Sequence, residues 1–319
     1  MEKVLILFGK AELNKNQPFS NKEHQLCYEY FYTLCAQSDL KMYRASYDWY
    51  DYKKNVFTYA WTFDVKKSTW KVERNVKPAL IYDKTNAQTE GYYKKELIAK
   101  SYTIINNLNF TRILDDKLIT SMIFDKWSKK SWIVNSHEKL VKILPKIKSQ
   151  KFVIKPISES GGKNIYIVDK KHVNKIVVDR EYIVQEFIDS SSGVPGIKTS
   201  FSMHDLRLVF VNETLAYSYL REPAKGSYLA NLSQGGSLTI VPKEKLPASL
   251  KPILKYVNEV FETFANRIFS IDLMFDENNK PWIIELNSMP GLFYTPEEKP
   301  YIAGLYKELI KLFRKKLGL

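Results

Sequence analysis

Cysteine and long apolar runs are scarce in this chain. Only two of its 319 residues are cysteines, and Cys27 and Cys35 fall within one predicted helix, which excludes the disulfide framework of small secreted domains. No apolar run approaches the roughly 18 residues that a membrane-spanning helix needs. The stretch from Val4 to Phe8 is shorter than the apolar part of a signal peptide, which takes about 7–15 residues. We therefore expect a cytoplasmic protein that does not cross a membrane.

The composition is that of a globular protein with an excess of basic residues. Hydrophobic residues make up 45% and charged residues 26%, which excludes a disordered or collagen-like chain. The length of 319 residues corresponds to about two domains of roughly 150 residues. The 49 Lys and Arg residues outnumber the 35 Asp and Glu residues and give a formal net charge of +14. This charge favours an acidic partner or a polyanionic ligand.

The first hundred or so residues predict a small α/β unit. A buried strand over Val4–Phe8 is followed by Ser20 and Glu23, which match a capping box that opens a helix through about Ala36. Aromatic residues crowd the segment 41–70, where alternation over 56–63 predicts strands. Aromatic residues beside lysines can bind single-stranded nucleic acid, but such alternation is more typical of a protein core. The unit lacks the Gly-rich turn of a dinucleotide-binding fold.

Later in the chain, two apolar strands carry acidic residues on one face. We predict strands over 269–276 and 281–287, joined by a two-residue turn at Asn278-Asn279 that pairs Glu277 with Lys280. This register places Asp272 directly opposite Glu285, and period-two alternation puts Asn287 on the same face. The other face is predicted to be core, and it would carry Ile271, Leu273, Phe275, Trp282, Ile284 and Leu286.

Two carboxylates held about 5 Å apart repel each other by roughly 3 kcal/mol at an effective dielectric constant of 20. A divalent cation between Asp272 and Glu285 removes this repulsion, and Asn287 offers a third hard oxygen ligand. Such a set suits Mg²⁺, or Mn²⁺ in its place. Without a metal, the same residues would form a solvated polar face.

A second pattern lies upstream, where an apolar strand over 151–156 ends at Lys155 and Pro156. A lysine at that place must extend to water or meet an anion. The turn that follows, Ser158 to Gly162, offers backbone N–H groups and hydroxyl groups to phosphate oxygens, although a Gly-Gly turn alone is more often a hairpin loop. Together with the acidic hairpin, this pattern predicts a nucleotide held between lysine and metal.

The order of these motifs resembles that of the ATP-grasp superfamily, and most closely RimK-type and glutathione-synthetase-like carboxylate–amine ligases. The segments that carry the resemblance are 116–118, 152–156, 160–162, 184–188, 205–207, Arg221, 231–236, 271–272 and 284–291. The resemblance implies a mixed α/β (α+β) ATP-grasp fold. We accordingly expect a small N-terminal α/β domain over 1–111, a central subdomain over 112–189 and a C-terminal subdomain over 190–319, the last two clasping ATP. The first hundred residues match no family pattern.

The resemblance also implies roles for single residues. ATP phosphates would contact Lys117, Lys155 and the covering loop Ser160, Gly161 and Gly162. Adenine and ribose would contact Gln185, Glu186, Phe187, Ile188 and Asp189. Arg207 and Arg221 would stabilise the transferred phosphate, and Asp272, Glu285 and Asn287 would bind Mg²⁺. Asn231 would belong to the catalytic set. Where related sequences commonly carry an arginine two residues before this asparagine, the chain has Leu229, so we expect Lys225 to replace that charge without a bidentate fork.

These implications predict an ATP- and Mg²⁺-dependent ligase that joins a carboxylate to an amine through an acyl phosphate. The substrates would be amino acids or peptides, and the basic surface would suit an acidic peptide acceptor. The first alternative is an ATP-grasp kinase that phosphorylates a small molecule and stops there. An alternative of another class is a basic nucleic-acid-binding module. The net charge of +14 and the aromatic cluster at residues 43–63 prompt it, but the core-like alternation of that cluster disfavours it.

Overall fold

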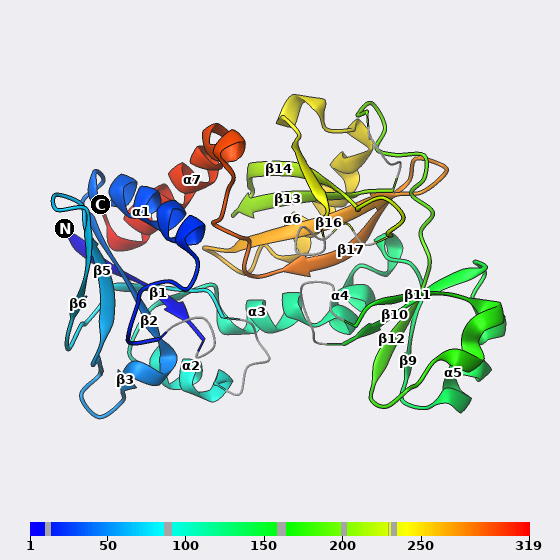
Figure 1. Cartoon of the computed structure of the whole chain (residues 1–319), viewed down its shortest axis with the longest axis horizontal. Helices are drawn as coiled ribbons and strands as arrows, with labels where there is room; N and C mark the ends of the chain where they lie inside the picture. The colour runs from blue at the N-terminus through cyan, green and yellow to red at the C-terminus, as the bar shows by residue number, and fades with distance from the viewer. Residues whose placement is uncertain (10–13, 86–90, 158–163, 199–202, 229, 231–234) are drawn as a thin grey trace.

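The structure is a computed structural model that describes residues 1–9, 14–85, 91–157, 164–198, 203–228, 230 and 235–319. These residues form three main β-sheets and seven α-helices. Figure 1 shows the N-terminal sheet and both termini on the left, the central sheet at lower right and the C-terminal sheet above it. The described residues contain no helix with the length and apolar character to cross a membrane.

The N-terminal sheet has six strands in the order β6-β5-β2-β1-β7-β8. The strands are β1 (Glu2–Phe8), β2 (Leu40–Ser46), β5 (Ala60–Asp64), β6 (Thr69–Glu73), β7 (Leu80–Asp83) and β8 (Ile104–Ile105). β2, β1, β7 and β8 run parallel, and β5 and β6 are antiparallel additions. Since β1 has one parallel neighbour on each side, the strand order reverses there, which in open α/β sheets is where ligands bind.

Two helices accompany this sheet, α1 (Lys22–Ala36) and α2 (Tyr92–Ala99). The predicted cap of α1 was wrong by one residue: the side chain of Asn21, rather than Ser20, accepts a hydrogen bond from the backbone N–H of His24 at 2.9 Å. Asparagine is as good an N-cap as serine, so the pattern alone could not separate the two neighbours.

The aromatic segment 41–70 forms part of the core, as its alternation indicates. It contains β2, the short pair β3 (Tyr50–Asp51) and β4 (Val56–Phe57), and β5. Tyr43 and Phe57 are fully buried, and the large apolar side chain exposed on this segment is that of Tyr52. The other aromatic side chains of the segment are buried or half-buried, which favours a core role over an exposed stacking surface.

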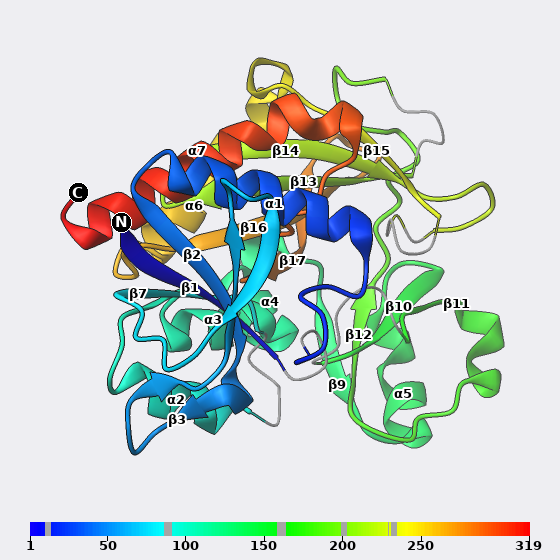
Figure 2. The ribbon, with the colours of Figure 1, turned by 60° about the vertical axis from the view of Figure 1, so that its left-hand side comes forward.

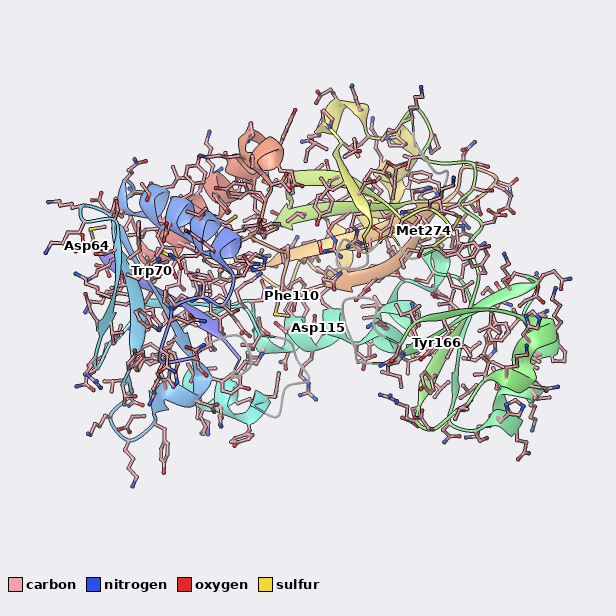
Figure 3. The ribbon with its side chains drawn as sticks, viewed as in Figure 1. Asp64, Trp70, Phe110, Asp115, Tyr166 and Met274 are labelled. Atoms are coloured by element: carbon pink, nitrogen blue, oxygen red, sulfur yellow. The ribbon has the colours of Figure 1, made fainter. Side chains whose placement is uncertain are left out.

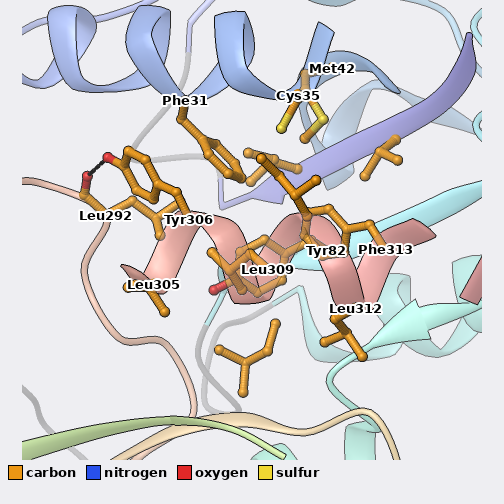
Figure 4. Close-up of a cluster of buried hydrophobic side chains, with 14 of the residues drawn as sticks. Phe31, Cys35, Met42, Tyr82, Leu292, Leu305, Tyr306, Leu309, Leu312 and Phe313 are labelled. Carbon is orange, nitrogen blue, oxygen red and sulfur yellow. Dashed lines mark hydrogen bonds between the residues drawn. The ribbon is translucent and has the colours of Figure 1, made fainter. Parts of the chain in front are cut away.

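The C-terminal helix α7 (Lys299–Leu317) connects the N-terminal sheet to the C-terminal sheet. Figure 4 shows Leu309 and Phe313 of this helix facing Phe31 and Cys35 of α1, with Tyr82 of β7 beside them. The same buried cluster also includes residues of the three C-terminal strands β13, β14 and β16. One helix therefore supplies core to both ends of the molecule.

The central sheet is antiparallel, with the order β11-β10-β12-β9. Its strands are β9 (Ser131–Val134), β10 (Lys151–Pro156), β11 (Tyr166–Asp169) and β12 (Tyr182–Glu186), and α5 (His137–Ile143) packs its buried side chains against them. The expected strand over 151–156 is confirmed at both ends. The helix α5 ends at Ile143, and the chain continues as a short 3₁₀ turn that contains a proline.

The C-terminal sheet is antiparallel, with the order β15-β14-β13-β16-β17 (Figure 2). Its strands are β13 (Asp205–Val211), β14 (Thr214–Glu222), β15 (Ser237–Ile240), β16 (Ile268–Phe275) and β17 (Pro281–Asn287). One face packs on α3 (Leu108–Asp115) and α6 (Lys251–Val260), and α4 (Lys117–Ile123) contacts β17. The helix α6 ends at Val260, and Asn266, which follows it, has a left-handed backbone with φ of 58°.

The helix α3 lies at the junction of the three sheets, as the labels of Phe110 and Asp115 in Figure 3 show. Its buried residues belong to the C-terminal core. The three sheets lie within the ranges 1–111, 112–189 and 190–319, and the division into domains at these boundaries remains a prediction.

Candidate active site

The strands β16 and β17 bring Asp272 and Glu285 directly opposite each other, although the predicted turn is wrong. The chain turns through three residues instead of two, since the N–H of Asp276 donates to the carbonyl of Lys280 and Asn279 has φ of 59°. This shift changes the register by one residue, and a β-bulge beyond Asp272 changes it back. The two irregularities cancel at the acidic pair.

Because of the same bulge, part of the predicted core face of β17 is wrong. Ile283 is buried at 3% exposure and lies in the core cluster, whereas Trp282 and Ile284 are only half-buried. A bulge adds a residue to one strand, so strict alternation fails across it. Leu286, Ile271, Leu273 and Phe275 are in the core as predicted.

Asp272 is 2% exposed and is bound by two arginines from neighbouring strands. Its carboxylate accepts from Nε and Nη2 of Arg207 at 2.6 and 2.5 Å, and from Nη2 of Arg221 at 2.8 Å. Burial acts to raise the pKa of Asp272, but the two guanidinium groups outweigh it and lower the pKa. The predicted repulsion with Glu285 is therefore already offset on the Asp272 side.

Asp205 completes this buried network and is the site residue that the sequence reasoning did not assign. It lies opposite Arg221 in the β13–β14 hairpin and accepts hydrogen bonds from its Nε and Nη2 atoms. Burial raises the pKa of Asp205 to about 6 against the opposing effect of Arg221. If the strand pairing that begins at the Asn212-Glu213 turn continued without interruption, Leu220 would lie opposite Asp205. The bulge near Val209 shifts the pairing by one residue and brings Arg221 to that place.

Two buried lysines face the acidic hairpin from other elements. Lys117 opens α4 directly after its N-cap Asp116, and its Nζ lies 3.8 Å from Oε1 of Glu285. Lys155, at the end of β10, is 5% exposed and donates to Oε1 of Gln185 at 3.0 Å and to the carbonyl of Ile284 at 3.4 Å. The central and C-terminal sheets thus meet at these side chains.

The electrostatic surroundings of Lys155 suit an anion that is not part of the chain. Burial lowers the pKa of its ammonium group to about 8, with Lys117 acting in the same direction and Glu285 against it. The carboxylate of Glu285 is therefore the nearby negative charge that stabilises the charged form of Lys155. A bound polyanion would stabilise that form further.

The donor chemistry of Asp272, Glu285 and Asn287 fits a hard divalent cation. Asn287 pairs with Ser270 two residues from the acidic pair, and its Nδ2 atom is buried without a hydrogen-bond partner in the described structure. Buried polar groups are nearly always hydrogen-bonded, so the unpaired amide nitrogen indicates that this side chain is held in place by other contacts. The described residues contain no cluster of three His, Cys, Asp or Glu side chains, so two carboxylates and an amide are what this site offers.

The segment predicted to hold adenine is the end of β12 and the residues after it. The N–H of Glu186 donates to the carbonyl of Lys130 at 3.1 Å, and the N–H of Phe187 donates to Oγ of Ser149 at 3.2 Å. Ile188 is buried and Asp189 is exposed, and the carboxylate of Asp189 accepts from the N–H of Ser191. This segment leaves the central sheet near Lys155 and Gln185.

The segment after Asn287 is held from the N-terminal side of the molecule. Alternate backbone carbonyls accept from side chains of four different segments: Ser288 from Asn106 at 2.9 Å, Pro290 from Lys84 at 2.5 Å, Leu292 from Tyr306 at 2.6 Å and Tyr294 from Cys27 at 3.5 Å. The N–H of Ser288 also donates to Asp115. The N-terminal sheet and α7 therefore position the end of the acidic hairpin.

Five further residues are predicted for the site. Ser160, Gly161, Gly162 and Asn231 lie outside the described residues. Lys225 is exposed in a turn after β14. The expected replacement of a family arginine by Lys225 remains a prediction.

Comparison with known proteins agrees with the motif order. A family model described as the RimK-like ATP-grasp domain matches residues 118–309. A probable alpha-L-glutamate ligase of Legionella pneumophila (strain Corby) is 27% identical over 147 residues, which are 44% of this chain and 43% of that protein. The match thus spans less than half the length of that relative.

Solved structures share the fold along nearly the whole chain. D-alanyl-alanine synthetase A of Vibrio cholerae has a TM-score of 0.67 at 11% identity and covers 100% of this chain and 99% of its own. A RiPP-associated ATP-grasp ligase of Chryseobacterium gregarium, in complex with ADP and a leader and core peptide, has a TM-score of 0.60 at 14% identity, with 99% and 97% covered. The expected ATP-grasp fold is confirmed, and the chain belongs to the RimK-like ATP-grasp family.

Proposed function

We propose that the protein is an ATP-dependent ligase that joins a carboxylate to an amine through an acyl phosphate, on an amino acid or a peptide. The observation that carries the proposal is the meeting of Lys117, Lys155, Glu285 and the Asp272 network between two sheets. Family membership supports the use of ATP. The leader and core peptide in the Chryseobacterium structure supports a peptide substrate, which the net charge of +14 would favour if it is acidic.

In this proposal the side chains bind and neutralise the triphosphate. Phosphoryl transfer needs positioning and charge stabilisation more than covalent help from the protein. Lys117 and Lys155 would contact phosphate oxygens, and the residues from Gln185 to Asp189 would hold the nucleoside. Arg207 and Arg221 lie on the polar face beside Asp272, where they would stabilise charge on the transferred group.

Asp272, Glu285 and Asn287 would hold Mg²⁺, with Mn²⁺ as its substitute. The ion would supply positive charge to the phosphate oxygens. Glu285 is the more available carboxylate, because its side chain is 24% exposed and its ion pair with Lys117 spans 3.8 Å. Asp272 has both oxygens bound to arginine but keeps lone pairs for a further partner.

The chemistry is testable with substrate pools. Protein, ATP and Mg²⁺ are incubated with pools of amino acids or acidic peptides, and ADP is measured together with amide products. We expect ADP release above background with one pool and, when hydroxylamine is added, a hydroxamate from the acyl phosphate. ADP with a phosphorylated product and no hydroxamate would indicate the kinase alternative. ATP binding without substrate-dependent ADP from any pool would refute both.

A further inference from the structure

Arg44 of β2 carries a buried charge that no anion of the described chain offsets. The residue is 2% exposed, and its Nε and Nη1 atoms are buried without a hydrogen-bond partner. The rings of Phe8, Phe19 and Tyr28 surround the guanidinium carbon at 4.4, 3.4 and 5.0 Å. Burial lowers the pKa of Arg44 to about 10, and the opposing influences come from tyrosines.

Aromatic rings attract a cation, but they do not replace the hydrogen bonds that a guanidinium group loses on leaving water. The same sheet shows how the chain usually treats such a charge. Lys95 is fully buried, and its Nζ lies 2.8 Å from the carboxylate of Asp83. Arg44 has no equivalent partner among the described residues, so its position calls for a ligand.

Further unpartnered donors lie on the same face of the sheet. Ile6 of β1 is in register with Arg44 of β2 on one side and with Tyr82 of β7 on the other. The hydroxyl groups of Tyr82 and of Tyr32, which α1 contributes above this row, are buried without hydrogen-bond partners. Three polar groups of this face are therefore unsatisfied, whereas buried polar groups are otherwise nearly always paired.

The cluster lies toward one edge of the sheet. Arg44 lies two residues before the end of β2, and Phe8 is the last residue of β1. Phe19 belongs to the segment that leads into α1, which covers this face in Figure 1. Open α/β sheets bind ligands at the carboxyl ends of their parallel strands, at the point where the strand order reverses. In this sheet the order reverses at β1.

We propose that Arg44 binds a carboxylate group of a ligand at the carboxyl edge of β1 and β2, with Tyr32 and Tyr82 as further hydrogen-bond donors. A planar guanidinium group matches a carboxylate in shape. One positive charge with neutral hydroxyl groups suits a monoanion, and the surrounding rings suit the methylene groups of an acidic side chain. The site shares no residue with the Asp272 network, so binding at Arg44 can be measured separately from the proposed ligase activity.

A binding experiment tests the site directly. The probes are N-acetyl-glutamate α-amide, which carries one carboxylate, its neutral glutamine counterpart and inorganic phosphate. The readout is the side-chain Nε–Hε NMR signal of Arg44, assigned by its absence in Arg44→Met. We expect a saturable shift with the acid and none with the amide. No shift with the acid, or tighter binding of phosphate than of the acid, would overturn the proposal.

Two variants separate a ligand site from a structural role. Arg44→Met keeps the bulk of the side chain and removes the charge, so it should raise the melting temperature without ligand and weaken acid binding at least tenfold. A structural arginine would give a lower melting temperature, which would contradict the proposal. Tyr32→Phe removes only a hydroxyl group and should weaken binding about threefold at an unchanged melting temperature. The matched control Tyr102→Phe, near the opposite face, should leave binding unchanged.

Discussion

Asp272 shares its carboxylate between Arg207 and Arg221, so it contributes to folding as well as to the proposed metal site. Seen from the sequence, Asp272 and Glu285 are equivalent members of one pair. The structure separates them, because one is 2% exposed within an ionic network and the other has a side chain that is 24% exposed. The common face was predictable from strand periodicity, but the direct pairing came out right because the three-residue turn and the bulge offset each other. The counter-charges come from β13 and β14, whose register depends on another bulge.

The first prediction contrasts these two carboxylates. Asp272→Asn leaves two arginines with less compensation and should lower the free energy of unfolding by about 3–5 kcal/mol, the usual cost of breaking a buried ion pair. Glu285→Gln should change it by less than about 1 kcal/mol, because partly exposed pairs contribute little. Urea denaturation measures both. Equal stability of Asp272→Asn and the parent protein would show that the network does not stabilise the fold.

The variant Glu285→Gln also tests the metal assignment. Glu285→Gln removes a charged ligand without unfolding the protein, so ADP release should fall by about a hundredfold and require more Mg²⁺ for half-maximal rate. Glu277→Gln changes a carboxylate in the nearby turn and serves as the control with an unchanged Mg²⁺ dependence. An unaltered Mg²⁺ dependence in Glu285→Gln would remove Glu285 from the metal site.

The third prediction concerns the ionisation of Lys155. Its pKa is lowered to about 8, so the ammonium group is mostly charged at pH 7 and mostly neutral at pH 9. If the charged form binds phosphate, ATP affinity should fall by about tenfold between these pH values. Calorimetric titration measures this change. Lys155→Met should bind ATP more weakly at pH 7 and lose most of the pH dependence, and an equal dependence in both proteins would assign it to another group.

Among the elements, the β16–β17 hairpin shows what strand patterns predict and what they omit. Both strands were predicted within one residue of their bounds, because apolar alternation and flanking polar residues mark them. The three-residue turn and the bulge were not predictable, since neither changes the residue pattern. Asp276 explains the turn: its side chain accepts from the N–H groups of Asn278 and Lys280 at 3.0 Å each.

The fourth prediction concerns this turn. Asn279 has φ of 59°, a left-handed conformation that costs a β-branched residue roughly 1–2 kcal/mol. Asn279→Val should lower the free energy of unfolding by about that amount, and Asn279→Gly should leave it equal or slightly higher. Thermal unfolding of the two variants beside the parent protein measures the difference. Equal destabilisation by valine and glycine would show that the Asn279 side chain, rather than its backbone, stabilises the turn.

At the scale of the whole molecule, α7 packs against both the N-terminal sheet and the C-terminal sheet that carries the site. The helix runs from Lys299 to Leu317 and ends at Gly318, which has a left-handed backbone. The sequence could not show that its buried face contacts two different sheets, because either sheet alone would need the same apolar residues. Tyr306 of this helix also holds the carbonyl of Leu292, five residues after Asn287.

The last prediction tests this connection. Leu309 is fully buried where α7 meets α1 and the N-terminal sheet, so Leu309→Ala should cost about 2–5 kcal/mol. Because the same cluster includes residues of β13, β14 and β16, hydrogen exchange should accelerate in both the N-terminal and the C-terminal sheet. Lys307→Ala, on the exposed side of the helix, is the control for helix composition. Faster exchange confined to the N-terminal sheet would show that the two sheets unfold separately and that α7 does not couple them.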